Sequence, residues 1–246
     1  MIHHDVSVLT ALVPIFAVIL SGYGLRRFNF PGNDVWPHVE RLTYFVLFPS
    51  LLLQKTATAS LPVQTVGPLA GALVSAVILM TGLLLLMRLW WPDSAAAFTS
   101  LFQGSIRFNT YVGLSAAFAL FGNEGLTLAA IAIAVLIPFV NLLCVTVLVS
   151  FNQTGTRSWR TVVQEIIRNP LIISCTAGIL LNLLGIGLHP AVNETLKIFG
   201  RASLPLGLLA VGAGLDISAI RATSRIVLFS CIIKLLILPV FMWTAT

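Results

Sequence analysis

The amino-acid sequence predicts an all-α protein that crosses a membrane several times. Of its 246 residues, 58% are hydrophobic and only 9% are charged, whereas soluble domains carry about 25% charged residues. The mean hydropathy is +1.00. Such a chain has too few polar side chains to cover a folded surface in water. We therefore expect its helices to be solvated by lipid.

Eight apolar stretches have about the length that a membrane-spanning helix needs, which is roughly 20 residues. Segments rich in glycine, proline, asparagine and charged residues separate them, as is typical of loops. The predicted spans are 7–25, 39–55, 65–90, 94–121, 125–150, 169–187, 195–217 and 224–246.

The basic residues predict an orientation in the membrane. Loops that follow odd-numbered spans carry eight arginines, whereas the opposite side has only Lys55 and Lys197. Because lysine and arginine concentrate in cytoplasmic loops, we expect the N-terminus outside the plasma (inner) membrane. The net charge of +6 then reflects orientation, and we expect no nucleic-acid partner. The arginines are Arg26, Arg27, Arg88, Arg157, Arg160, Arg168, Arg221 and Arg225.

The longest loop, residues 152–168, suggests two repeats of opposite orientation. It follows five spans, and an odd number of helices inverts the second copy of a repeat. Residues 1–151 would form the first repeat, and 169–246 would hold three helices of the second. Each half has a proline at a turn and another within a span before leucines, which are Pro31 and Pro49, then Pro190 and Pro205. Inverted repeats of this kind are typical of secondary transporters.

The fourth span contains a polar segment, "QGSIRFNT" (103–110), at membrane depth. Glycine, serine, asparagine and threonine are weak helix formers, so we expect the helix to unwind here. A half-helix that starts after Asn109 would point free N–H groups into the gap, which favours a carboxylate. Arg107 would add a charge, and Asn109 and Thr110 would add hydrogen bonds. The alternatives are that Arg107 pairs with a backbone carbonyl or reaches the interface, and that Asn109 and Thr110 bond neighbouring helices.

Lys234 is predicted to lie near the middle of the last span, about 14 Å beyond Arg225. An unpaired lysine at that depth is unfavourable, so it should face either a cavity or a structural partner. The three cysteines fall singly in apolar stretches, and no HExxH or GxSxG motif occurs. The sequence therefore predicts no enzyme activity, no metal site and no cofactor.

Four segments, "VERLTYFVLFPSLLL", "RFNTYVGL", "IIRNPLIISCTAGILLNLLGI" and "ASLPLGLLAVGAGLD", together resemble the auxin efflux carrier family, whose bacterial branch comprises organic-acid permeases. The resemblance implies ten helices in two inverted five-helix repeats, with the fourth and ninth helices unwound where they cross. It also implies small organic anions as substrates, alternating access and a homodimer. The chain would then lack the last two helices.

Several positions match the family pattern, and others depart from it. Asn109-Thr110 matches the pair at the first crossover, Gly113 the small residue one turn later, and Pro49 the proline beside the site. Plant members have a proline where this chain has Phe108, and an asparagine where it has Leu171. They also have a charged pair in the third helix, whereas residues 65–87 of this chain contain no charged residue. Arg168-Asn169-Pro170 resembles the start of the sixth helix, and Lys234 with Pro239 resembles the eighth.

The predicted function is secondary transport of a small organic anion, a carboxylate, by alternating access around the broken helix. One alternative is a proton- or sodium-coupled antiporter or symporter of the same architecture. Another is a membrane subunit without transport activity, if the chain naturally has this length. The predicted substrate-binding residues are Asn109, Thr110, Arg107, Phe108, Gly113, Pro49, Ser50, Pro205 and Lys234.

Overall fold

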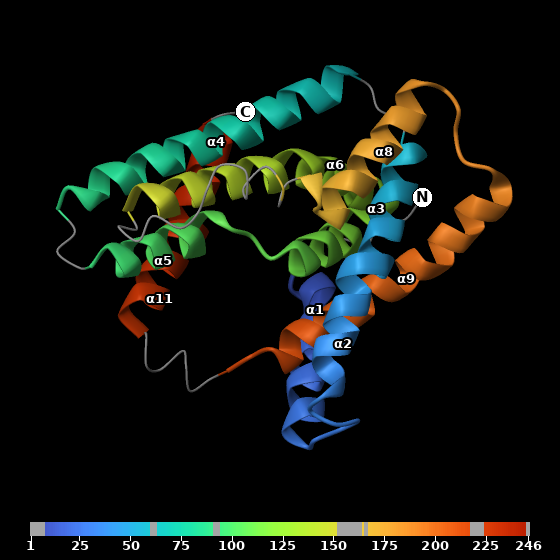
Figure 1. Ribbon diagram of the computed structural model, residues 1–246, viewed down its shortest axis with the longest axis horizontal. Helices are drawn as coiled ribbons and strands as arrows, with labels where there is room; N and C mark the ends of the chain where they lie inside the picture. The colour runs from blue at the N-terminus through green and yellow to red at the C-terminus, as the bar shows by residue number, and fades with distance from the viewer. Residues whose placement is uncertain are drawn as a thin grey trace. The chain divides into compact units, whose positions relative to one another are not determined.

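The computed structural model describes residues 8–59, 63–90, 94–151, 164, 167–216 and 224–244, in which every regular element is a helix (Figure 1). Most of the linker 152–168, with Arg157 and Arg160, lies outside these residues, as does Arg221. The elements are α1 (Val8–Arg27), α2 (Val35–Leu42), η1 (Thr43–Leu47), α3 (Phe48–Ala57), α4 (Val63–Arg88), α5 (Ala95–Ile106), α6 (Thr110–Phe151), α8 (Pro170–Leu183), α9 (Pro190–Ala213), α11 (Ser224–Ile232), η2 (Ile233–Ile237) and α12 (Leu238–Thr244).

Within the described residues, four stretches are long and apolar enough to span a membrane, judged by length and composition. One of them covers 54 residues, more than twice the roughly 20 needed for one crossing. Helix α8 is apolar but shorter. The protein is therefore an all-α membrane protein with several crossings, as its composition predicts. The four stretches are Val66–Arg88, Ala95–Leu148, Pro190–Ala213 and Ile226–Trp243.

Each of the eight predicted spans overlaps a helix or a continuous run of helices. The predicted boundary between the fourth and fifth spans coincides with a kink inside α6 at Gly122, which has φ 61° and ψ −146°. Glycine tolerates this left-handed backbone because it has no Cβ. The number of spans and the inverted repeats stay predictions.

Two prolines each follow a π-helical segment by the same spacing. Segment η1 ends two residues before Pro49, and η2 ends two residues before Pro239. A proline in a helix lacks an N–H donor and clashes with the preceding turn. A π-bulge accommodates this loss by inserting one residue into the turn.

The described chain forms two compact units that do not follow chain order. Unit 1 holds residues 1–60, 109–134 and 169–215, and unit 2 holds residues 61–108, 135–168 and 216–246. Each unit thus combines helices from both predicted repeats. The chain passes from unit 2 to unit 1 between Phe108 and Asn109, inside the predicted helix break.

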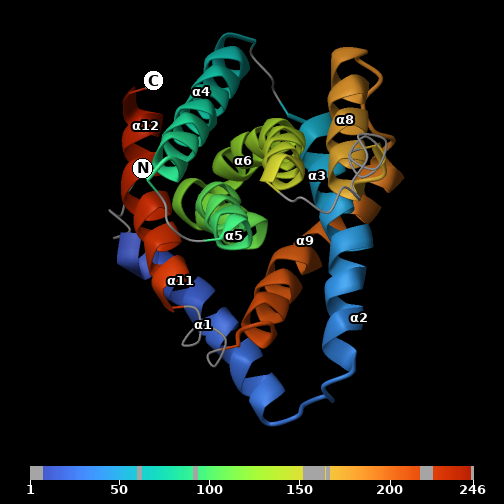
Figure 2. The ribbon, with the colours of Figure 1, turned by 60° about the vertical axis from the view of Figure 1, so that its left-hand side comes forward.

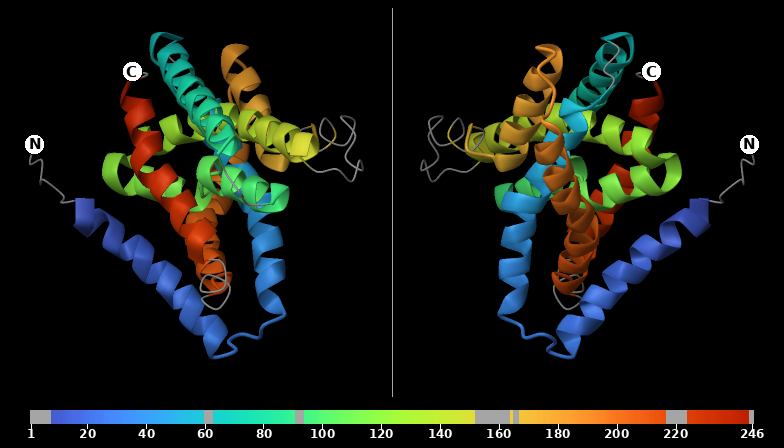
Figure 3. Two further views of the ribbon diagram at one scale, coloured as in Figure 1. Left: turned by 90° about the vertical axis from the view of Figure 1, so that its left-hand side faces the viewer. Right: turned by 90° about the vertical axis from the view of Figure 1, so that its right-hand side faces the viewer.

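In unit 1, α1 turns through loop 28–34 into α2 (Figure 3), and α1 packs closely on α9. Glycines permit this approach, because a Cβ on Gly22 would lie 2.1 Å from the carbonyl oxygen of Leu209. A Cβ on Gly212 would lie 1.8 Å from the carbonyl oxygen of Ile19. Small residues at helix crossings are typical of packing in membranes.

Helices α3 and α8 lie side by side in the same unit (Figure 2). Gly178 of α8 is again the point of closest approach, since its Cβ would lie 1.9 Å from Thr56 Oγ1. The side-chain amide of Asn182 donates to the carbonyl oxygens of Ala57 and Ala59, at 3.0 and 2.7 Å. These bonds satisfy carbonyls that the end of α3 leaves without helical partners.

Unit 2 has an apolar core formed by α4, α5, the second part of α6, and η2. The side chains of Met80, Leu84, Leu101 and Phe102 are completely buried there. At one edge, the guanidinium of Arg88 lies 5.4 Å from the ring centroid of Phe98. A cation over an aromatic face is attracted by the ring quadrupole.

The glycine contact between α1 and α9 can be tested with two neighbouring substitutions. Gly22→Ala should lower the thermal unfolding midpoint, because its methyl group would overlap the Leu209 backbone and overpacking costs about 1–3 kcal/mol. Gly24→Ala is the matched control, since a Cβ there meets nothing within 4 Å; it should leave the midpoint unchanged or raise it. Equal effects of the two substitutions would contradict the proposed close contact.

Candidate functional site

The break predicted in the fourth span is present in the structure. Helix α5 ends at Ile106, α6 begins at Thr110, and the residues between them are not helical. Arg107 has extended backbone angles, φ −74° and ψ 131°. The chain therefore presents the C-terminus of one half-helix and the N-terminus of another within three residues.

Asn109 caps the N-terminus of α6. Its side-chain oxygen accepts hydrogen bonds from the N–H groups of Tyr111 and Val112, at 3.1 and 3.2 Å. The backbone oxygen of Asn109 accepts from the N–H of Gly113 at 2.9 Å. An asparagine that caps in this way uses only its amide oxygen, which leaves its NH2 group to donate to a ligand.

Asn169 caps α8 with the same geometry and offers an internal comparison. Its side-chain oxygen accepts from the N–H groups of Leu171 and Ile172, at 2.9 and 3.3 Å. The Asn169 side chain also interacts with Tyr44. Asn109 has no such additional partner among the residues that the structure describes. Of the two caps, Asn109 is exposed whereas Asn169 is half-buried.

Three elements of unit 1 meet beside the start of α6. The ring of Tyr111 contacts that of Phe48 edge-to-face, with 4.5 Å between the centroids. A Cβ on Gly207 of α9 would lie 2.2 Å from Tyr111 Cδ1. Pro49 and Ser50 follow Phe48 in the first turn of α3, and the Ser50 hydroxyl donates to the carbonyl of Val46 at 2.7 Å. The first turns of α3 and α6 are thus fixed against α9.

The other end of the break lies in unit 2, where Lys234 Nζ donates a hydrogen bond to the carbonyl oxygen of Arg107. A cation beside the C-terminus of a helix interacts favourably with the helix dipole. This contact provides the structural partner that the sequence led us to expect for Lys234. The guanidinium of Arg107 is hydrogen-bonded to Cys144, whose side chain lies in the core of unit 2.

A cavity of about 590 Å³ lies within unit 1, between α1, α3, α6 and α9. Of the nine predicted site residues, Pro205 alone lines it; Ser50 borders a smaller hollow beside α9. The remaining predicted residues lie at the helix break, in α3, or in unit 2. The cavity is lined by Ala11, Pro14, Ile15, Val18, Leu51, Gln54, Lys55, Ser115, Phe118, Ala119, Asn123, Leu126, Lys197, Gly200, Arg201, Leu204, Pro205 and Leu208.

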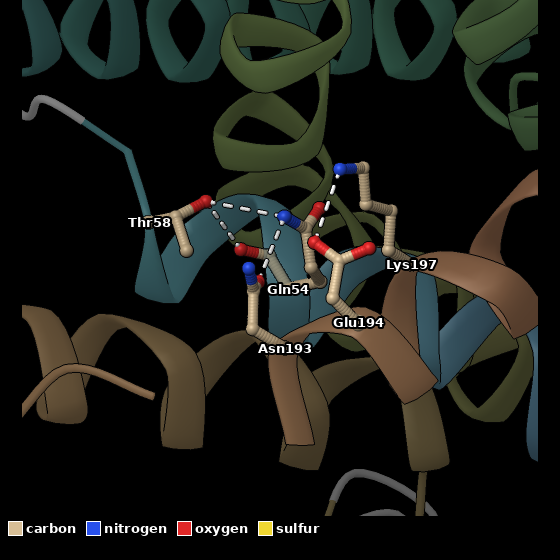
Figure 4. Close-up of polar contacts among 5 residues, drawn as sticks. All are labelled: Gln54, Thr58, Asn193, Glu194 and Lys197. Carbon is tan, nitrogen blue, oxygen red and sulfur yellow. Dashed lines mark hydrogen bonds and ion pairs between the residues drawn. The ribbon is translucent and has the colours of Figure 1, made fainter. Parts of the chain in front are cut away.

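Polar side chains gather near one part of this cavity. Lys55 Nζ donates to Asn123 Oδ1 at 2.8 Å. Figure 4 shows the neighbouring contacts, in which Gln54 donates to Asn193 at 3.2 Å and Lys197 pairs with Glu194 at 3.2 Å. In the sequence alone, Lys55 and Lys197 indicate only an orientation in the membrane. Their placement in one cavity depends on tertiary packing, although the spacing of Lys197, Gly200, Arg201, Leu204 and Leu208 already marks one helix face.

No group of His, Cys, Asp and Glu suited to a metal ion occurs among the residues that the structure describes. The polar side-chain groups that the structure describes at the helix break and in the cavity are amides, hydroxyls, ammonium groups and the guanidinium groups of Arg107 and Arg201. Apart from the carbonyl-bound Lys234, these groups can serve an anion by hydrogen bonding and charge.

Comparison with known proteins gives one family match. Residues 152–246 match the model of a family described as "Membrane transport protein". The matched segment includes α8, α9 and the run from α11 to α12, and it ends at the last residue of the chain. No curated protein matches the chain.

The hydrogen bond from Lys234 to the Arg107 carbonyl predicts that replacing the lysine with an apolar residue lowers the stability of the protein. Lys234→Met should destabilise the protein by about 1.5–3 kcal/mol, the contribution of a hydrogen bond to a charged group. Lys234→Arg, which keeps the charge and donors, should retain most of the stability. Thermal unfolding in lipid nanodiscs measures both. If the Met variant were more stable than wild type, the lysine would be an unpaired charge in an apolar setting, and the contact would be disproved.

Proposed function

Because residues 152–246 match the model of a family described as "Membrane transport protein", we propose that this chain is part of a secondary transporter of small organic anions. The family match agrees with the resemblance to auxin efflux carriers that the sequence motifs indicate. In this proposal a carboxylate binds at the helix break, and the protein exposes it alternately to the two sides of the membrane. The N-terminus lies outside the plasma (inner) membrane.

The proposal rests chiefly on the N-terminus of α6, which lies at the helix break. The first N–H groups of a helix lack intrahelical partners, and the helix dipole places partial positive charge at this end. The side-chain oxygen of Asn109 accepts hydrogen bonds from two of these N–H groups, and its own NH2 group remains available to donate. Thr110 adds a hydroxyl at the first helical position. These donors suit a carboxylate, as at the discontinuous helices of other transporters.

A site for a coupling cation has less support than the carboxylate site at the helix break. Hard cations such as Ca²⁺ and Mg²⁺ are bound largely by carboxylate and carbonyl oxygens, and half-helix C-termini coordinate Na⁺ in several transporters. Here the carbonyl of Arg107, at the C-terminus of α5, already accepts from Lys234. Among the residues that the structure describes, the side chains that line the cavity of unit 1 include no aspartate or glutamate. The arrangement therefore favours anion transport without a bound metal cation.

The proposal predicts that Asn109 contributes separately to stability and to anion binding. In purified protein, a panel of small mono- and dicarboxylates should raise the thermal midpoint of wild type. A ligand at 100 times its Kd stabilises by about 2.7 kcal/mol. Asn109→Ala should lower the basal stability by about 1 kcal/mol through loss of the cap and abolish the carboxylate response.

Two control variants separate these effects. Asn109→Asp keeps a capping oxygen but places a negative charge at the site, so it should keep the stability and lose the response. Asn169→Ala removes the equivalent cap of α8 and should reduce stability while leaving the response intact. A carboxylate response that survives in both Asn109 variants would refute a site at the helix break.

A further inference from the structure

We propose that the cavity of unit 1 is a second anion site, one that binds an amphiphilic carboxylate with its head near Lys55, Lys197 and Arg201. The site is distinct from the helix break, because Asn109 and Thr110 do not line it. The inference therefore stands on its own contacts and does not require the transport mechanism proposed above.

The cavity has the size and construction of a ligand site. Its volume of about 590 Å³ lies within the roughly 300–1,000 Å³ of small-molecule pockets. Each of its four helices contributes side chains from one face, and α9 does so over three turns, from Lys197 to Leu208. Gly200 allows α9 to approach α3 beside the cavity, since a Cβ there would lie 3.2–3.3 Å from Leu51. The walls are thus regular helices in close contact.

The charge of the lining is positive. Lys55, Lys197 and Arg201 are its ionisable side chains, and Lys55 and Lys197 are near enough to repel each other. Among the described residues, Lys55 donates only to the neutral amide of Asn123. Bringing like charges together is unfavourable, and an anion between them removes this repulsion.

The acidic group nearest this cluster does not neutralise it. Glu194 pairs with Lys197, but the two side chains are 61% and 42% exposed, and exposed ion pairs contribute little. Arg201 has no hydrogen-bond or ion-pair partner within the described parts of the chain. A carboxylate can accept from a guanidinium through two parallel hydrogen bonds, so Arg201 is the natural anchor for the head group.

Apart from Gln54, Ser115 and Asn123, the remaining lining is apolar, and it suits a ligand with an apolar body. Ile15 of α1 and Leu208 of α9 are 6% and 5% exposed and belong to one hydrophobic cluster. Along α9 the two cations come first and Leu204 and Leu208 follow on the same face, so charge gives way to apolar surface over about 16 Å. This order fits a molecule with a carboxylate at one end and a hydrocarbon chain or ring at the other.

The test uses a matched set of probes with protein in lipid nanodiscs. Hexanoate, octanoate and decanoate differ only in chain length, octylammonium carries the opposite charge, and empty nanodiscs correct for partitioning into lipid. Isothermal titration should show binding of the carboxylates, with affinity rising about fourfold per buried methylene. Octylammonium should not bind.

Variants assign the site. Arg201→Gln should weaken octanoate binding about tenfold, and Lys55→Gln should weaken it in the same direction. Arg41→Gln, which removes an exposed arginine of α2 that does not line the cavity, is the matched control and should bind as wild type does. Asn109→Ala should also bind octanoate normally. Arg201 and Lys55 come from different helices, so a folding defect in one variant leaves the other as a test.

Three outcomes would overturn the inference. Octanoate binding that is unchanged in both Arg201→Gln and Lys55→Gln would place the anion elsewhere. Binding that is lost in Asn109→Ala but kept in Arg201→Gln would place it at the helix break, which supports the proposed function and refutes the second site. Absence of octanoate binding to wild type would refute the second site, whatever short carboxylates do at Asn109.

Discussion

The interruption of the helix at residues 107–109 is the constraint on which the rest of the structure depends. In a membrane every backbone polar group needs a partner, and each one left without a partner costs several kcal/mol. The break creates a helix C-terminus and a helix N-terminus three residues apart in the chain. Lys234 donates to the first of them, and Asn109 caps the second. Two of the most polar positions in the spans are explained by this single interruption.

The π-bulges place polar side chains of neighbouring spans at helix ends. Tyr44 is the second residue of η1, and its side chain interacts with that of Asn169, the cap of α8. Lys234 is the second residue of η2 and bonds the carbonyl at the end of α5. Both bulges precede a proline by the same spacing. At Pro49 and Pro239 the π-bulge that precedes the proline thus also carries a polar side chain that contacts a neighbouring helix terminus.

Features that depend on local sequence could be predicted, and features that depend on packing could not. Composition predicts the helices, and the weak helix formers around Asn109 predict the break, which the structure confirms. The cavity was missed because Lys55 and its partner Asn123 are 68 residues apart and their helices carry no mark of a shared site. Lys234 was expected to need a partner, but the partner is a backbone carbonyl, which no side-chain pattern reveals. The two compact units likewise combine distant segments.

The first part of α6 connects the two anion sites that we propose. Between Asn109 and the kink at Gly122 it carries the capped N-terminus and, from Ser115 to Ala119, part of the cavity wall. The partial positive charge of the helix N-terminus has the same sign as the lysines and arginine of the cavity. Unit 1 thus offers anions two positive positions, one at the N-terminus of α6 and one formed by side chains of α3 and α9 in the cavity beside it. A bound metal cation would meet repulsion at both, because the nearby carboxylate that the structure describes, Glu194, is exposed and pairs with Lys197 alone. The distribution of charge, more than any single residue, is the basis of our proposal that this unit binds an organic anion.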